Sequence, residues 1–181
     1  MPTTAEDVEV MILAVADQDR TAFLSLYDAT SAKLFGVCLR VLKDRGDAED
    51  VLQDVFIKIW RNADRYKANG LSPMTWLITV ARNAAIDRVR TRKAPAEDTE
   101  AAERMPASGP TPEGAAIAAS EARRIAACLG ELEDNRADAV RGAYLDGQSY
   151  QDLADRFDVP LNTMRTWLRR SLMKLKECMS R

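Results

Sequence analysis

The chain has 181 residues, of which 46% are hydrophobic and 30% are charged, and this balance is typical of a folded protein with one or two small domains. It contains no histidine, which excludes Ser-His-Asp triads, Cys-His nucleophile pairs and zinc sites built from cysteine and histidine together. The net charge of −2 disfavours nucleic-acid binding only on average, because basic residues are concentrated in two segments, 82–93 and 161–181.

Helices are the elements that the residue pattern predicts, so we expect an all-α fold. The first two should span about Ala5–Asp17 and Thr21–Leu42, and the segment Asp44–Gly46 should end the second. A third helix should begin behind Asp47, which we interpret as its N-cap, with Asp50 at the N3 position.

This third helix has the clearest amphipathic pattern in the chain. Its apolar residues recur every three or four positions and predict a buried stripe in which Trp60 has a packing role: Ala48, Val51, Leu52, Val55, Phe56, Ile59 and Trp60. The opposite face is polar and should be exposed: Glu49, Asp50, Gln53, Asp54, Lys58 and Arg61.

A fourth helix, about Met74–Arg92, contains the first basic segment. Small and apolar residues predict its buried side: Leu77, Val80, Ala81, Ala84 and Ala85. The outer side combines basic and amide groups: Thr79, Arg82, Asn83, Ile86 and Arg90. From these residues alone, the outer side is either a solvated surface or a surface that binds nucleic acid.

The residues from 94 to 118 differ in composition from their surroundings, with four of the seven prolines and five acids against one base. We interpret them as a flexible acidic linker between two small helical domains, 1–93 and 119–181, with helix resuming near Pro112–Ala118.

The second domain should contain helices over 121–132, 135–146, 149–157 and 161–179. The last two are joined by a tight turn, Asp158 to Pro160, and predict a helix-turn-helix motif that docks on DNA. Ser149 and Asp152 form the capping pattern of its first helix, and Pro160 suits the start of the second.

The longer helix of this motif has two distinct faces. Met164, Leu168, Leu172 and Leu175 should point inward, and Trp167 beside them favours packing over a base contact. The outward face can donate hydrogen bonds to base edges and phosphates, and consists of Thr166, Arg169, Arg170 and Met173, with Arg165 at the border.

The three cysteines, Cys38, Cys128 and Cys178, are isolated in the sequence and form no C-x-x-C pair. We expect them to be small buried apolar residues in a reducing compartment, and a redox role stays open. No apolar run is long enough to span a membrane, and the acidic start lacks the pattern of a signal peptide, so we expect a cytoplasmic protein without membrane insertion.

Three motifs in order resemble the extracytoplasmic-function (ECF), RpoE-like group of bacterial sigma factors in the sigma-70 superfamily. GDAEDVLQDVFIKIWRNADRY is similar to the segment that binds core RNA polymerase, and SPMTWLITVARNAAIDRVRTRK to the segment for the −10 element. LEDNRADAVRGAYLDGQSYQDLADRFDVPLNTMRTWLRRSLMKLK resembles the −35-binding domain. The resemblance implies a region 2 bundle and a region 4 helix-turn-helix domain, and no catalysis, cofactor or metal in this chain.

The resemblance also implies roles for particular residues. Asp50, Gln53 and Asp54 match residues that contact the clamp helices of the largest polymerase subunit. Lys58 lies on the same face. Asn83 matches a residue at the pocket for a flipped −10 base, where nearby backbone would be held by Arg82, Arg88 and Arg90. The −35-reading surface would consist of Arg165, Thr166, Arg169 and Arg170, while Trp167 departs from the basic residue often found at its position.

The implied partners are core RNA polymerase, through its clamp helices and β flap, promoter DNA and an anti-sigma factor that restrains the chain. The SPMTWL and LYDATSAKL segments are similar to the subgroup controlled by zinc-containing, cupin-like (ChrR-like) anti-sigma proteins in photooxidative stress. Any zinc would then lie in the partner.

Three other classes of protein are less compatible with the residues. A two-domain response regulator with a LuxR-like DNA-binding half would need strands in the first domain. A helical adaptor without a DNA role would leave both basic helices as solvated surface, and an enzyme would need a nucleophile and base that the sequence does not provide.

Overall fold

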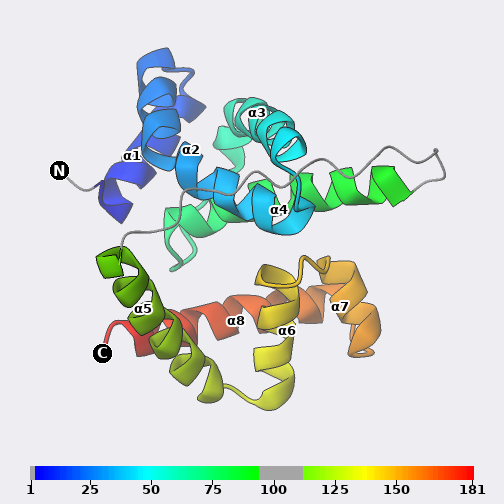
Figure 1. Cartoon of the computed structure of the whole chain (residues 1–181). Coiled ribbons are helices and arrows are strands. Elements are labelled where there is room, and N and C mark those ends of the chain that lie inside the picture. Colours follow the sequence, from blue (N-terminus) through cyan, green and yellow to red (C-terminus); the bar gives the residue numbers. More distant parts are fainter. Residues whose placement is uncertain (1–2, 94–111) are drawn as a thin grey trace. The chain divides into compact units, whose positions relative to one another are not determined.

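The computed structural model of the chain describes residues 3–93 and 112–181, and these residues form two separate helical domains (Figure 1). The division between the domains falls at residues 96 and 97. Most of the linker that we predict lies outside the described residues. Helix α5 begins at Pro112, within the stretch where we expect helix to resume.

Within residues 3–93, the chain forms α1 (Ala5–Ala16), α2 (Arg20–Leu42), α3 (Arg45–Asn62), the short 3-10 helix η1 (Ala63–Arg65) and α4 (Pro73–Lys93). Side-chain caps determine where the first two begin. Thr4 and Asp7 form a reciprocal capping box at α1, and the carboxylate of Asp19 accepts hydrogen bonds from two backbone N–H groups of α2. The four α-helices lie close to the predicted ranges, whereas η1 was not predicted.

The start of α3 differs from the prediction that Asp47 is its N-cap. The N-cap is Asp44, whose carboxylate accepts a hydrogen bond from the backbone N–H of Asp47 at 2.8 Å. Asp47 therefore lies at N3, where the helix dipole favours its charge, and it forms ion pairs with Arg88 and Arg92 of α4. The sequence does not distinguish the two aspartates, because both precede the apolar stripe at a distance that suits a cap.

The core of the first domain lies where α2, α3 and α4 pack together. The apolar stripe of α3 is buried as predicted, from Ala48 to Ile59. Trp60 confirms its predicted packing role, since its ring lies edge-on against Phe23 of α2 with 5.2 Å between the ring centroids. Cys38 of α2 is fully buried in the same core, as expected.

Within residues 112–181, the chain forms α5 (Pro112–Gly130), α6 (Asp134–Tyr144), α7 (Tyr150–Arg156) and α8 (Leu161–Met179). The last two form the predicted helix-turn-helix, with Ser149 and Asp152 in a capping box and Asp158 of the turn in the left-handed region at φ 51°. Helix α6 passes close to this motif at Gly142, where a Cβ atom would lie 2.7 Å from Leu153 Cδ2. A larger residue there would displace the ends of the Gln148 and Leu153 side chains.

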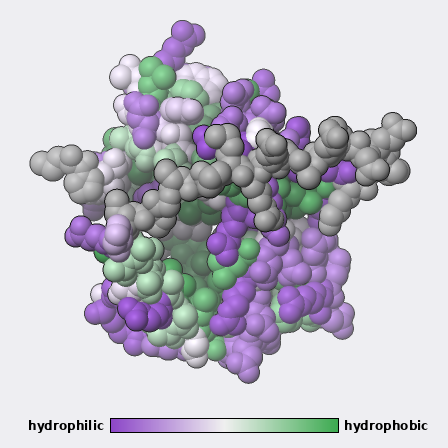
Figure 2. Space-filling view, in the orientation of Figure 1, coloured by the Kyte–Doolittle hydropathy of each residue, from purple (hydrophilic) through white to green (hydrophobic). Residues whose placement is uncertain are grey.

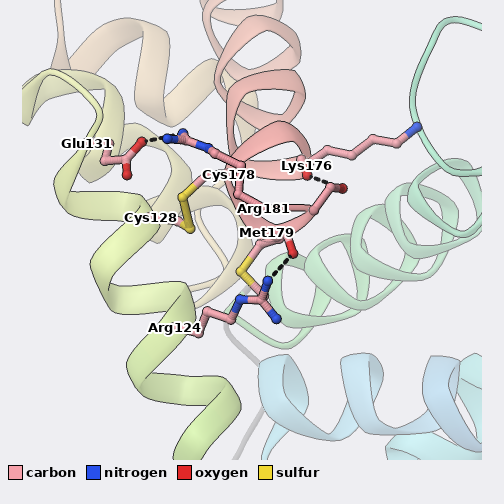
Figure 3. Close-up of a disulfide and its surroundings, with 8 residues drawn as sticks. Arg124, Cys128, Glu131, Lys176, Cys178, Met179 and Arg181 are labelled. Atoms are coloured by element: carbon pink, nitrogen blue, oxygen red, sulfur yellow. Dashed lines mark hydrogen bonds and ion pairs between the residues drawn. A yellow bond between two sulfur atoms is a disulfide. The ribbon is translucent and has the colours of Figure 1, made fainter.

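Cys128 and Cys178 form a disulfide between the ends of α5 and α8 (Figure 3). The prediction of isolated, reduced cysteines was wrong for this pair, which is 50 residues apart on helices whose mutual packing the sequence does not specify. Two further contacts join the same ends of the helices: Arg124 Nη2 donates to Met179 O at 2.6 Å, and Arg181 Nη2 pairs with Glu131 Oε2 at 2.7 Å.

In the view of Figure 2, the face of the second domain over α6 and α7 is mainly hydrophilic. Across residues 3–93 and 112–181, every helix is too short or too polar to cross a membrane.

Candidate nucleic-acid interface

The outward face of α8 presents the four residues that we predict to contact DNA. Arg165, Thr166, Arg169 and Arg170 are all exposed, which confirms their predicted outward orientation, while their contact with DNA stays a prediction. Two of them are held within the helix by Asn162, whose side-chain oxygen accepts from Arg165 Nη1 at 3.2 Å and whose backbone oxygen accepts from Thr166 Oγ1 at 3.0 Å. The face therefore offers several hydrogen-bond donors on a rigid helix.

The inward face of α8 fixes this orientation. Met164 and Leu168 are almost completely buried, and Leu172 and Leu175 are half-buried, as predicted. Ser171 is buried as well, which the apolar pattern did not predict.

Trp167 lies at the border between the two faces and is half-buried. Its ring packs near the ring of Phe157, with 6.1 Å between centroids, which fits the predicted packing role. Its second neighbour was not predicted: the Arg136 guanidinium of α6 lies over the Trp167 ring, 3.4 Å from the centroid.

Fewer side chains of α4 are exposed on its outer side than the sequence predicts. Asn83 is exposed, but Arg82 is only 1% exposed and Ile86 is also buried, so their placement on the solvent side was wrong. The physical reason is that α4 packs against α1, α2 and α3, which together bury more than one side of the helix. Arg82 Nη1 donates to Asn83 Oδ1 at 3.4 Å, so the buried guanidinium contacts the amide of Asn83.

The basic residues farther along α4 differ in their surroundings. Arg90 is exposed, whereas Arg88 donates to Asp47 at 3.0 Å and Arg92 pairs with the same carboxylate. One aspartate therefore offsets part of the charge of two arginines. The positive charge of Arg88, one of the arginines expected near the −10 pocket, is thus partly neutralised.

The polar face of α3 is exposed as predicted, including Asp50, Gln53, Asp54 and Lys58. Ile57 lies on the same face and is 48% exposed, which the sequence reading missed. Ile57 adds one exposed apolar side chain to this otherwise polar face. Ile57 directly follows Phe56 of the buried stripe, and this position off the stripe could have indicated that its side chain is exposed.

The described residues also include titratable groups that lie away from these surfaces. Burial raises the pKa of the Cys38 thiol to about 11, so this cysteine is protonated inside the core at neutral pH. Among the residues that the structure describes, no cluster of three or more cysteine and acidic side chains could hold a metal ion.

Comparisons with known proteins match both domains. The family model for Sigma-70 region 2 matches residues 26–94, and that for Sigma-70, region 4 matches residues 122–175. The ECF RNA polymerase sigma factor SigK of Mycobacterium sp. (strain KMS) is 34% identical over 99% of this chain and 94% of its own length. SigK of Mycobacterium tuberculosis (strain ATCC 25177 / H37Ra) is 33% identical over 98% of this chain and 96% of its own.

Two solved structures are similar over most of their length. Rhodobacter sphaeroides SigE, solved in complex with the anti-sigma ChrR, is 25% identical with a TM-score of 0.49, covering 93% of this chain and 98% of that one. CnrH, solved in complex with the cytosolic domain of CnrY, is 18% identical with a TM-score of 0.44, covering 96% and 97%.

Proposed function

The chain belongs to the ECF RNA polymerase sigma factors, and from that premise we propose how its exposed surfaces divide the work of promoter recognition. A sigma factor is a non-enzymatic subunit that binds core RNA polymerase, directs it to promoters and aids promoter opening. The region 2 domain would comprise residues 1–93 and the region 4 domain the residues that follow the linker.

The α3 face is the proposed surface for core polymerase. Asp50, Gln53, Asp54 and Lys58 would contact the clamp helices, and we add Ile57 because it is exposed among them. A partly apolar centre with a polar rim is the usual composition of a protein interface.

The α4 surface is proposed to act on the −10 element. Asn83 would read an unpaired base, with Arg90 on nearby backbone. Arg82 would act through Asn83, and Arg88 would reach DNA only by exchanging its pairing with Asp47 for a phosphate.

The α8 face is proposed to read the −35 element in the major groove. The observation that carries this assignment is that Arg165, Thr166, Arg169 and Arg170 are all exposed on the second helix of a helix-turn-helix whose inward face is buried.

We also propose that an anti-sigma factor restrains the chain, since ECF sigma factors are commonly held inactive in this way, and that the regulon serves a stress response in the cytoplasm. If the partner is ChrR-like, its zinc would belong to the partner.

Run-off transcription tests the proposal. Bacterial core polymerase is mixed with the full chain and a pool of promoter fragments from the source genome, and RNA 5′ ends are mapped. We expect discrete starts that appear only when the chain is present. Random starts, or the same starts with core polymerase alone, would refute the proposed function.

A further inference from the structure

A hollow of about 580 Å³ lies between the start of α6 and one side of α8, from Asn162 to Lys174. Arg136, Trp167, Arg170 and Lys174 line it, and so does Thr166 from the proposed DNA-reading face. Among the described residues that line the hollow, three are cationic and one, Glu133, is acidic. The excess of positive charge in a concave site favours an anionic ligand.

Arg136 is the residue whose surroundings point most directly to a ligand. Its guanidinium is held over the Trp167 ring at 3.4 Å from the centroid, a cation–π contact that fixes the group in place. Its Nη1 atom is buried and makes no hydrogen bond to any described residue. Its ion pair with the exposed Glu133 joins Nε at 3.6 Å and leaves that inner nitrogen unsatisfied.

A buried donor without an acceptor is unfavourable, and a small shift of the guanidinium that brings Nη1 to an oxygen anion in the hollow would remove that penalty. The start of α6 does not add to this preference, because Glu133 at its N-cap and Asp134 in its first turn already place negative charge there. The preference for an anion therefore depends on Arg136, Arg170 and Lys174.

We propose that this α6–α8 pocket (Arg136, Thr166, Trp167, Arg170 and Lys174) binds a backbone phosphate of the duplex whose bases α8 reads. Arg136 donates to the phosphate, and Trp167 is a positioning residue that holds the guanidinium instead of reading a base. The inference rests on the proposed function, because Thr166 and Arg170 belong both to the pocket and to the −35 face. An anion held here lies beside any DNA docked on α8, which is why we assign duplex phosphate as the ligand.

The test uses holoenzyme assembled from the full chain and bacterial core polymerase, with a promoter that the wild-type holoenzyme recognises. Binding is measured over a range of salt concentrations for wild type, Arg136→Gln and the control Arg141→Gln. Arg141 suits the comparison because it lies on the same helix, is exposed, pairs with Asp138 and does not line the pocket.

We expect Arg136→Gln to weaken binding about fivefold near 0.15 M salt, equally on the intact promoter and on one with a substituted −35 element. The slope of log affinity against log salt should become shallower by about 0.9, the value for one lost phosphate contact. Arg141→Gln should match wild type in both measurements. An Arg136→Gln slope equal to that of wild type would overturn the assignment.

Trp167 is tested by a double-mutant cycle. Trp167→Ala should change the slope as Arg136→Gln does, and the double variant should bind no more weakly than Arg136→Gln alone. Trp167→Phe keeps an aromatic face and should stay close to wild type, which preserves the test if Trp167→Ala fails to fold. A Trp167→Ala loss confined to the intact −35 sequence, and additive with Arg136→Gln, would instead make Trp167 a base reader.

Different results would overturn the proposed function and the phosphate site. A wild-type holoenzyme that makes no promoter-specific start would overturn the proposed function and the phosphate site together. Specific starts combined with an unchanged Arg136→Gln slope would overturn the phosphate site alone.

Discussion

Removing the Cys128–Cys178 disulfide should destabilise the second domain and leave the first unchanged. The bond closes a loop with a sequence separation of 50, and the chain-entropy relation gives about 14 cal/mol/K for a loop of that size, or about 4 kcal/mol at 25 °C. Without it, the end of α5 keeps the burial of Leu129 and two exposed polar contacts. Such contacts contribute little each, so α5 should open locally before the domain unfolds.

Hydrogen–deuterium exchange with peptide analysis can separate the two domains. Addition of a dithiol reductant to the wild-type chain should accelerate exchange at the end of α5 by up to about a thousandfold, with a smaller effect on α8. Peptides of α1 to α4 should exchange unchanged. The Cys128→Ala/Cys178→Ala variant provides the control, since it should exchange rapidly with or without reductant.

The reasoning would be refuted if reductant left the exchange of α5 as it was, because the bond would then add nothing to the packing. It would also be refuted if the reductant affected both domains equally, since the disulfide lies wholly within the second.

The remaining predictions concern the surfaces and the buried thiol. Gln53→Ala with Asp54→Ala should weaken core-polymerase binding by about tenfold, measured by fluorescence titration, and unaltered affinity would remove α3 from the interface. Asn83→Ala should reduce promoter opening more than duplex binding, whereas Arg169→Ala should weaken −35 recognition by about 1–3 kcal/mol; equal effects in permanganate footprinting and in duplex binding would contradict the division of roles. Thiol titration of the unreduced chain should find one cysteine after denaturation and three after reduction. Because burial raises the pKa of Cys38 to about 11, its alkylation in the native chain should be slow at pH 8 and increase as the pH approaches 11, and rapid labelling of the native chain at pH 8 would contradict this.

Helix positions and their buried faces could be predicted from the sequence where one face of a helix packs and the other meets water. The stripe of α3 and the bounds of α8 follow from apolar residues at helical spacing, and Ser149 with Asp152 marks the start of α7 by local hydrogen bonding. These features depend on neighbours within one or two turns of the chain.

The errors arose where several elements meet. Arg82 is buried because three other helices surround α4, and a single-helix projection assigns it to the solvent side. Asp47 is paired with arginines of another helix, so its role could not follow from its spacing within α3. The disulfide and the contact of Arg136 with Trp167 both join helices through tertiary packing, which no local pattern encodes.

The central claim is that one chain contacts a promoter through two separate domains, with Asn83 of α4 at one element and the outward face of α8 at the other. Run-off transcription from a promoter substituted one base pair at a time tests it most directly. We expect two blocks of sensitive positions, near −10 and −35, with Arg169→Ala removing the sensitivity of the upstream block alone. A single block, or an upstream block that Arg169→Ala leaves intact, would contradict it.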